Sequence, residues 1–258
     1  MKKKRTFSRI YIGAVLLLMY LPIIVVAVYS FNSTKMNTVW TGFSLQWYQK
    51  LFRDAVMLEA LKNSLVLAFS ASLLSAVIGT VGAVGLVKCK SALNGAVEAT
   101  AIIPLMIPEI ITGMVFLAFF SWFGLRFGML TLIIAHSSFC VPYVFMMVKS
   151  SLAGLDQGIE DAAADLGAGR FRVFWDIILP HILPAAASGT LMAFAMSLDD
   201  VVISFFVTGA QVNTLPLKIY SQLKSGVTPE VNALCTLMLA VTLLIVTAMF
   251  MIRRKQAK

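Results

Sequence analysis

The sequence predicts an all-α membrane protein with six transmembrane helices. Of its 258 residues, 59% are hydrophobic and only 13% are charged, whereas about a quarter of the residues in a soluble domain are charged. The apolar residues gather in runs of the roughly 20 residues that a helix needs to cross about 30 Å of hydrocarbon. Lys and Arg collect at the chain ends and between these runs, which is typical of membrane topology. The net charge of +9 therefore does not indicate a nucleic-acid partner.

Six runs meet the length requirement: residues 10–31, 63–87, 99–125, 127–148, 182–215 and 231–252. The first run follows MKKKRTFSR and exceeds the ~7–15 apolar residues of a signal peptide, so it is expected to be retained. The third run contains Glu109, which follows Pro104 and Pro108. The fifth run is interrupted by Asp199 and Asp200 and has the least defined bounds.

The distribution of basic residues predicts the orientation of the chain. With six spans both termini lie on one side, and that side holds fourteen of the 21 Lys and Arg residues. Because cytoplasmic loops are enriched in Lys and Arg, both termini are expected in the cytoplasm. The chain then divides into an N-terminal helix with an external segment (1–56), a five-helix membrane domain (57–252) and a basic cytoplasmic tail (253–258).

Two features inside the spans have structural explanations. Ser75, Gly79 and Ala83 recur at every fourth position of the second span, and such a small face allows close helix packing in lipid. His136 in the fourth span is interpreted as an interhelical hydrogen-bonding residue in preference to a proton relay, although the sequence identifies no partner for it. The three cysteines, Cys89, Cys140 and Cys235, form no C-x-x-C pair, so neither a disulfide framework nor a metal site is implied.

A polar segment, DAAADLGAGRFRVFWDIILP at 161–180, separates the fourth and fifth spans. Apolar residues at helical spacing predict one short helix carrying Ile159, Ala162, Ala163 and Leu166, and a second carrying Phe171, Phe174, Trp175 and Ile178. Gly167 and Gly169 are expected to end the first helix, because glycine adopts the left-handed cap conformation without strain. Geometry alone also allows an interfacial helix that only connects two spans.

This segment resembles the EAA loop of bacterial ABC importer permeases, whose pattern is E-A-A-x-x-x-G, nine residues, then I-x-L-P. The matching positions are Asp161, Ala162, Ala163, Gly167, Ile177, Leu179 and Pro180. Asp161 stands where the family usually has Glu, and the adjacent Glu160 points about 100° away on a helix. The resemblance implies a type I ABC importer permease, an all-α fold in which this loop forms a cytoplasmic coupling helix that docks on an ATPase. The chain contains no G-x-x-x-x-G-K-[ST] motif, so it is expected to bind no cofactor and to catalyse no reaction, with ATP and Mg on the partner ATPase.

Three carboxylates lie in or beside apolar spans: Glu109, Asp199 and Asp200. Because a carboxylate costs roughly 2.5–3.5 kcal/mol at the bilayer centre, they predict either an acidic path for a cation, together with Ser197, or a hydrated helix break near the external interface. Adjacent aspartates on a helix cannot face the same way. One is therefore expected to face the path while the other hydrogen-bonds locally.

The stretches SLDDVVISFFVTG and LPLKIYSQLKSGVTPEVNA resemble permease subunits of spermidine/putrescine importers, and the resemblance covers most of the chain. It implies a polyamine cargo, a second permease subunit, an ATPase dimer, an external solute-binding protein and a place in the bacterial cytoplasmic membrane. Trp47 and Tyr220 are candidates for cation–π contact with the cargo, although anchoring at the lipid interface explains each more simply. An importer of another solute and a proton-driven transporter that uses Glu109, His136 and the aspartate pair remain alternatives. A membrane enzyme has no supporting nucleophile or metal motif.

Overall fold

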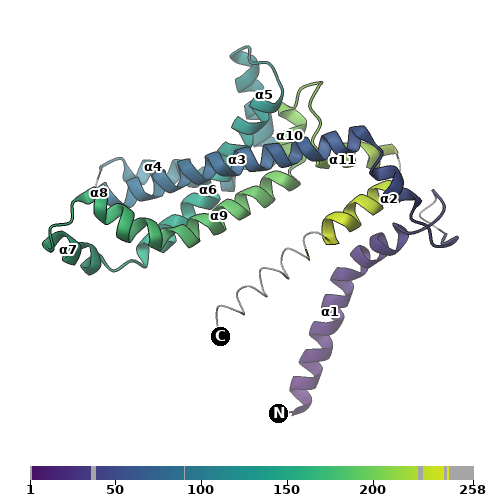
Figure 1. The fold of residues 1–258 in the computed structure, drawn as a ribbon, viewed down its shortest axis with the longest axis horizontal. Coiled ribbons are helices and arrows are strands. Elements are labelled where there is room, and N and C mark those ends of the chain that lie inside the picture. The colour runs from purple at the N-terminus through teal and green to yellow at the C-terminus, as the bar shows by residue number, and fades with distance from the viewer. Residues whose placement is uncertain (1, 36–38, 90, 226–228, 241–242, 244–258) are drawn as a thin grey trace. The chain divides into compact units, whose positions relative to one another are not determined.

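The structure, a computed structural model, describes residues 2–35, 39–89, 91–225, 229–240 and 243 (Figure 1). Apart from one isolated bridge between Asn32 and Phe43, the regular elements of this part of the chain are helices, which confirms the predicted all-α class. They are α1 (Lys2–Tyr29), α2 (Gln46–Leu51), α3 (Ala55–Lys88), α4 (Asn94–Met106), α5 (Glu109–Trp122), α6 (Met129–Ala153), α7 (Gln157–Asp165), α8 (Arg170–Val173), a π-helical turn (Phe174–Ile178), α9 (Leu179–Asp199), α10 (Val202–Val207), α11 (Leu215–Ser225) and a helix over 229–240.

Four helical stretches of the described chain are long and apolar enough to cross a membrane, and a bent pair raises this to five. The predicted sixth span is helical over 229–240, and most of its remainder, like the basic tail at 253–258, lies outside the described residues. The chain forms two compact units, Met1–Leu58 with Ile219–Lys258 and Glu59–Lys218.

In the first unit, the segment after α1 folds around the buried side chain of Asn32. The backbone N–H of Thr41 donates to Asn32 Oδ1 over 2.9 Å, and Asn32 Nδ2 donates to the carbonyl of Val39 over 2.7 Å. The indole N–H of Trp47 donates to the Asn32 carbonyl over 2.6 Å. Lys50 Nζ of α2 lies 2.8 Å from Glu230 Oε2, which ties α2 to the helix over 229–240.

The second unit is built around α6, which packs between α3 and α9 (Figure 1). A Cβ on Gly79 of α3 would lie 2.9 Å from Val144 Cβ, and a Cβ on Gly189 of α9 would lie 2.8 Å from Val144 Cα. Ser75 Oγ donates to the carbonyl of Ser137 over 3.0 Å. The predicted small face of the second span is confirmed, because it is the face on which α3 approaches α6.

Two of the predicted spans are broken. The run expected at 99–125 forms α4 and α5, bent by 111°, because the residue before a proline is driven out of the helical region: Ile107, which precedes Pro108, has a φ of −84° and a ψ of 131°. The run expected at 182–215 ends its long helix at Asp199 and continues in the short α10. Asp200 is extended, with a ψ of 127°. The interruption expected at Asp199 and Asp200 is thus a break between two helices, and the run expected at 99–125 is divided at Ile107 and Pro108.

Candidate functional site

The two helix breaks meet at an acidic cavity of about 210 Å³ in the second unit. Glu109 is the first residue of α5, Asp199 is the last residue of α9, and Asp200 follows it in the break. All three line the cavity, together with Phe139, Met196, Val201 and Val202. Residues that are 90 positions apart in sequence come together here because α10 packs against α5.

The structure separates the two adjacent aspartates. The side chain of Asp200 is only 5% exposed. Its Oδ1 accepts from the N–H of Ile203 over 3.1 Å and its Oδ2 accepts from the N–H of Ser204 over 2.8 Å, so it stabilises the first turn of α10. Asp199 and Glu109 are both exposed, and within the described part of the chain neither forms an ion pair or a side-chain hydrogen bond. The carboxylates of Glu109 and Asp199 are therefore available to a ligand in the cavity, whereas the carboxylate of Asp200 is used in hydrogen bonds within the protein.

His136 lies directly behind the cavity and is completely buried. Its Nδ1 is 2.8 Å from Ser197 Oγ on α9, and its Nε2 is 3.1 Å from Ser204 Oγ on α10 and 3.4 Å from Asp200 Oδ2. The interpretation of His136 as an interhelical hydrogen-bonding residue is confirmed. Ser197 is buried and bonded to His136, and it does not line the cavity in which the sequence analysis placed it.

Phe139 is an aromatic wall of the cavity that the sequence analysis did not identify. It lines the cavity beside the carboxylates, and its ring packs edge-on against the His136 ring with 5.3 Å between centroids. Its position three residues after His136 could have identified it, because residues at i and i+3 lie on the same face of a helix.

The two aromatic residues suggested by sequence both lie in the first unit. Trp47 is buried, and besides its hydrogen bond to Asn32 its ring has Lys50 Nζ 5.9 Å from the centroid. Tyr220 on α11 is exposed, with Lys224 Nζ 5.0 Å from its ring centroid. Trp47 thus has a structural place in the fold, and both rings already face a lysine of the protein.

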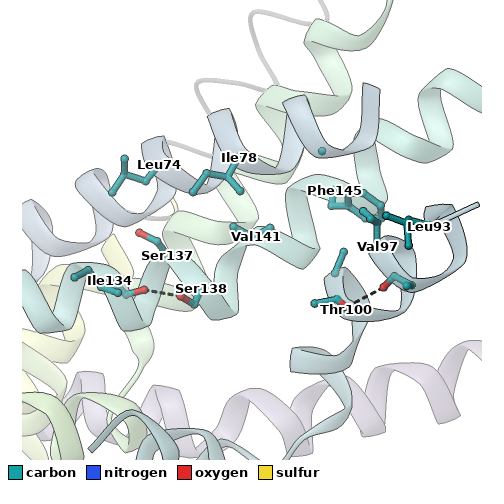
Figure 2. A pocket seen from close by; sticks show the side chains of 13 residues that line it. Leu74, Ile78, Leu93, Val97, Thr100, Ile134, Ser137, Ser138, Val141 and Phe145 are labelled. Atoms are coloured by element: carbon teal, nitrogen blue, oxygen red, sulfur yellow. Dashed lines mark hydrogen bonds between the residues drawn. The ribbon is translucent and has the colours of Figure 1, made fainter. Parts of the chain in front are cut away.

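A larger hollow of about 680 Å³ lies between α3, α4 and α6 and carries no charged side chain among its lining residues (Figure 2). Its hydroxyl groups are engaged locally: Ser138 Oγ donates to the carbonyl of Ile134 over 2.8 Å, and Thr100 Oγ1 donates to the carbonyl of Ala96 over 2.8 Å. The other walls include Leu74, Ile78, Val97 and Phe145. This surface is suited to an apolar neighbour and offers no counter-charge to a cation.

The polar segment between α6 and α9 contains the predicted helix, break and second helix. Gly167 has a φ of +85°, and the N–H groups of Gly167 and Ala168 donate to the carbonyls of Ala164 and Ala163 over 2.9 and 3.0 Å, which is the Schellman pattern. The cap expected at Gly169 is wrong, because Gly169 is extended, with a φ of −69°, and instead precedes α8.

The faces of α7 differ in what they contact. Glu160 forms an ion pair with Lys88 at the end of α3, and Ala163 packs against the hydrophobic core. Asp161 and Ala162 are exposed. Large apolar side chains are also exposed on and after α7: Ile159, Leu166, Phe171 and Trp175. Of the other motif residues, Ile177 and Leu179 are half-buried against the core and Pro180 is exposed. One face of α7 is thus fixed to the membrane unit, while the other presents an acidic and apolar surface outward.

Comparison with known proteins identifies relatives of this chain. A family model described as the inner membrane component of binding-protein-dependent transport systems matches residues 75–255. The chain is 40% identical to the spermidine/putrescine transport system permease protein PotC of Haemophilus influenzae, over 92% of each chain. It is 44% identical to the putrescine transport system permease protein PotI of Escherichia coli K12, over 86% of this chain and 81% of that protein.

Solved structures of ABC transporters share the fold. A chain of a bacterial transporter involved in import of the acidic polysaccharide alginate superimposes with a TM-score of 0.73 at 14% identity, over 98% of both chains. A chain of the MetNI methionine ABC transporter in inward-facing form gives 0.61 at 19% identity, over 83% of this chain and 97% of that one. The expected permease fold is thereby confirmed.

Proposed function

The chain belongs to the family of inner membrane components of binding-protein-dependent transport systems, and on this premise we propose that it is the polyamine-conducting permease subunit of an ATP-driven importer. As a family member it is a multi-pass inner membrane protein and a transport component, not an enzyme. The polyamine cargo is supported by relatives named for spermidine and putrescine transport. The single observation that carries the proposal is the cavity in which Glu109 and Asp199 are exposed without a counter-charge from the described residues.

The chemistry of the cavity suits an alkyl chain with protonated amines. Glu109 and Asp199 provide charge for ammonium groups, and the carboxyl end of α9 adds the negative end of a helix dipole. The ring of Phe139 gives a π face, worth about 0.5–2 kcal/mol to a cation. Met196, Val201 and Val202 provide apolar contact for the methylene groups between the amines.

The segment at 157–180 is proposed as the cytoplasmic docking element for a partner ATPase, with Asp161, Ala162, Gly167 and the exposed apolar side chains forming the contact. Both termini then lie in the cytoplasm. The remaining partners are a second permease subunit and an external solute-binding protein, and ATP with Mg binds the ATPase. The hydrogen bonds of both His136 ring nitrogens to buried side chains support a structural role for this residue, and the uptake assay below separates the proposal from the proton-driven alternative.

The test is uptake of labelled putrescine and spermidine by proteoliposomes that contain the complete transporter and its binding protein. Glu109→Gln and Asp199→Asn each remove one carboxylate from the cavity. A charge pair at 4 Å is worth about 1–4 kcal/mol between water and a protein surface, so uptake at low substrate should fall about tenfold or more for each variant. Glu59→Gln is the matched control, because Glu59 is an exposed carboxylate of α3 that does not line the cavity.

Unchanged uptake by the Glu109→Gln/Asp199→Asn double variant would overturn the cavity as the cation path. Uptake that stops when the proton gradient is collapsed, with ATP still supplied, would overturn the ATP-driven mechanism in favour of a proton-coupled one.

A further inference from the structure

A buried polar cluster joins three helices at the wall of the acidic cavity. It consists of His136 from α6, Ser197 from α9, Asp200 from the break, and Ser204 from α10, and we call it the His136 clasp. His136 is 0% exposed, Ser204 0% and Ser197 3%. Of these four side chains, only Asp200 also lines the cavity.

Each hydrogen-bonding group of the ring has a partner. Because the Asp200 carboxylate accepts hydrogen bonds, a proton on Nε2 of the ring faces Asp200 and Ser204, while Nδ1 pairs with the Ser197 hydroxyl. Buried polar groups are costly unless they are paired, so the ring is held in one orientation. The bonds join the last turn of α9 to the first turn of α10 through a residue of neither helix.

The clasp spans the point where the backbone changes direction. Asp200 is extended, with a ψ of 127°, and Val201 returns to the helical region, with a ψ of −37°. Asp199 immediately precedes this turn and lines the cavity. A rotation of the break by one residue would exchange the places of the two aspartates, because adjacent helical side chains point about 100° apart.

We propose that His136 is a positioning residue that sets this register: it holds Asp200 in the wall, and Asp199 is thereby the carboxylate presented to the cargo. The functional consequence rests on the proposed function, in that the cavity receives an ammonium group. His136 also supports the cavity wall through its edge-on contact with Phe139. It therefore determines the strength of cation binding in the cavity without touching the cargo.

The experiment uses the complete transporter with its binding protein. His136→Leu removes both nitrogens at similar volume, His136→Gln returns one donor and one acceptor, and Ser197→Ala removes the Nδ1 partner alone. Ser138→Ala is the control, because the Ser138 hydroxyl donates to the Ile134 carbonyl within its own helix. Two quantities are measured: the substrate dependence of uptake, and the rate at which a cationic methanethiosulfonate labels Val201→Cys in a background without Cys89, Cys140 and Cys235.

Loss of a buried hydrogen bond to a charged group corresponds to roughly a tenfold change or more in an equilibrium. We expect His136→Leu to raise the apparent KM for putrescine about tenfold with a smaller effect on maximal rate. His136→Gln should recover part of that loss, and Ser197→Ala should fall between wild type and His136→Leu. Labelling of Val201→Cys should speed up several-fold in His136→Leu and stay unchanged in Ser138→Ala.

Unchanged labelling and unchanged KM in an assembled His136→Leu transporter would overturn the proposal, as would an equal fall in maximal rate for His136→Leu and His136→Gln with KM constant. The labelling rate does not depend on the cargo. Faster labelling with no change in KM would therefore retain the positioning role while contradicting the cation path through the cavity.

Discussion

Replacement of Gly167 by valine tests whether the geometry of the polar segment couples ATP hydrolysis to transport. Gly167 has a φ of +85°, and a residue with a Cβ pays about 1–2 kcal/mol in this region, with β-branched residues at the upper end. Nothing lies within 4 Å of a Cβ built at this position. The whole effect is therefore conformational, and packing does not contribute.

The cost acts on the end of α7. The hydrogen bonds from the N–H groups of Gly167 and Ala168 to the carbonyls of Ala164 and Ala163 require the left-handed turn. A penalty of about 1–2 kcal/mol reduces the population of this turn by roughly 5–30-fold relative to competing conformations. The exposed surface that includes Asp161 and Leu166 would then be presented in the docked orientation far less often.

The assay is the number of ATP molecules hydrolysed for each polyamine imported by reconstituted transporter. We expect this ratio to rise about fivefold or more in Gly167→Val, with Gly167→Asn intermediate because Asn tolerates the left-handed region. Gly169→Val is the matched control: Gly169 has a φ of −69° and a ψ of 158°, which suits valine, and a Cβ there meets nothing within 4 Å. Equal ratios for Gly167→Val and Gly169→Val would refute the reasoning.

Two further predictions use matched variants of this chain. Lys88→Glu and Glu160→Lys should each loosen α7 from α3 and raise the number of ATP molecules hydrolysed for each polyamine a few-fold, since a partly exposed ion pair is worth up to about 1 kcal/mol. The double variant with the two charges exchanged should restore the wild-type ratio. A double variant as poorly coupled as the worse single variant would exclude a role for the ion pair between Lys88 and Glu160. Gly79→Ala should destabilise the purified complex by about 1–3 kcal/mol through overpacking, because its Cβ would lie 2.9 Å from Val144 Cβ. Gly85→Ala, which meets nothing within 4 Å, should be neutral or stabilising in the same thermal unfolding assay, and equal losses for both variants would contradict the close approach.

Local pattern was sufficient for several features of this protein. Long apolar runs predicted membrane helices because burial in lipid requires them, and the spacing of Ser75, Gly79 and Ala83 predicted a close helix contact that the structure places against α6. Gly167 was recognisable as a helix cap because few other residues adopt its φ. In each case the physical requirement acts within one helix or one turn.

Features that depend on tertiary partners were not predictable. The prolines before Glu109 indicated the place of the break, but the 111° angle between α4 and α5 is seen only in the structure. Ser197 was expected in the path and instead bonds to His136, a partner 61 residues away. Phe139 was missed because its role arises only where the cavity forms, and Trp47 is enclosed by a loop whose fold depends on Asn32.

The positions of the acids follow from the breaks in the helices. A carboxylate in an apolar span needs water, a donor or a cation, and an interrupted helix supplies free backbone N–H groups at the new amino end. Asp200 uses those of Ile203 and Ser204, which leaves Asp199 and Glu109 for the cavity. The same unit connects this site to the polar segment by direct contact: Glu160 to Lys88 of α3, and Gly79 of α3 to Val144 of α6, the helix that carries His136. Direct contacts therefore connect α7, through α3 and α6, to the helix break that positions Asp199. The Lys88 variants change the contact at the α7 end of this series, and the His136 variants change the contact at the break.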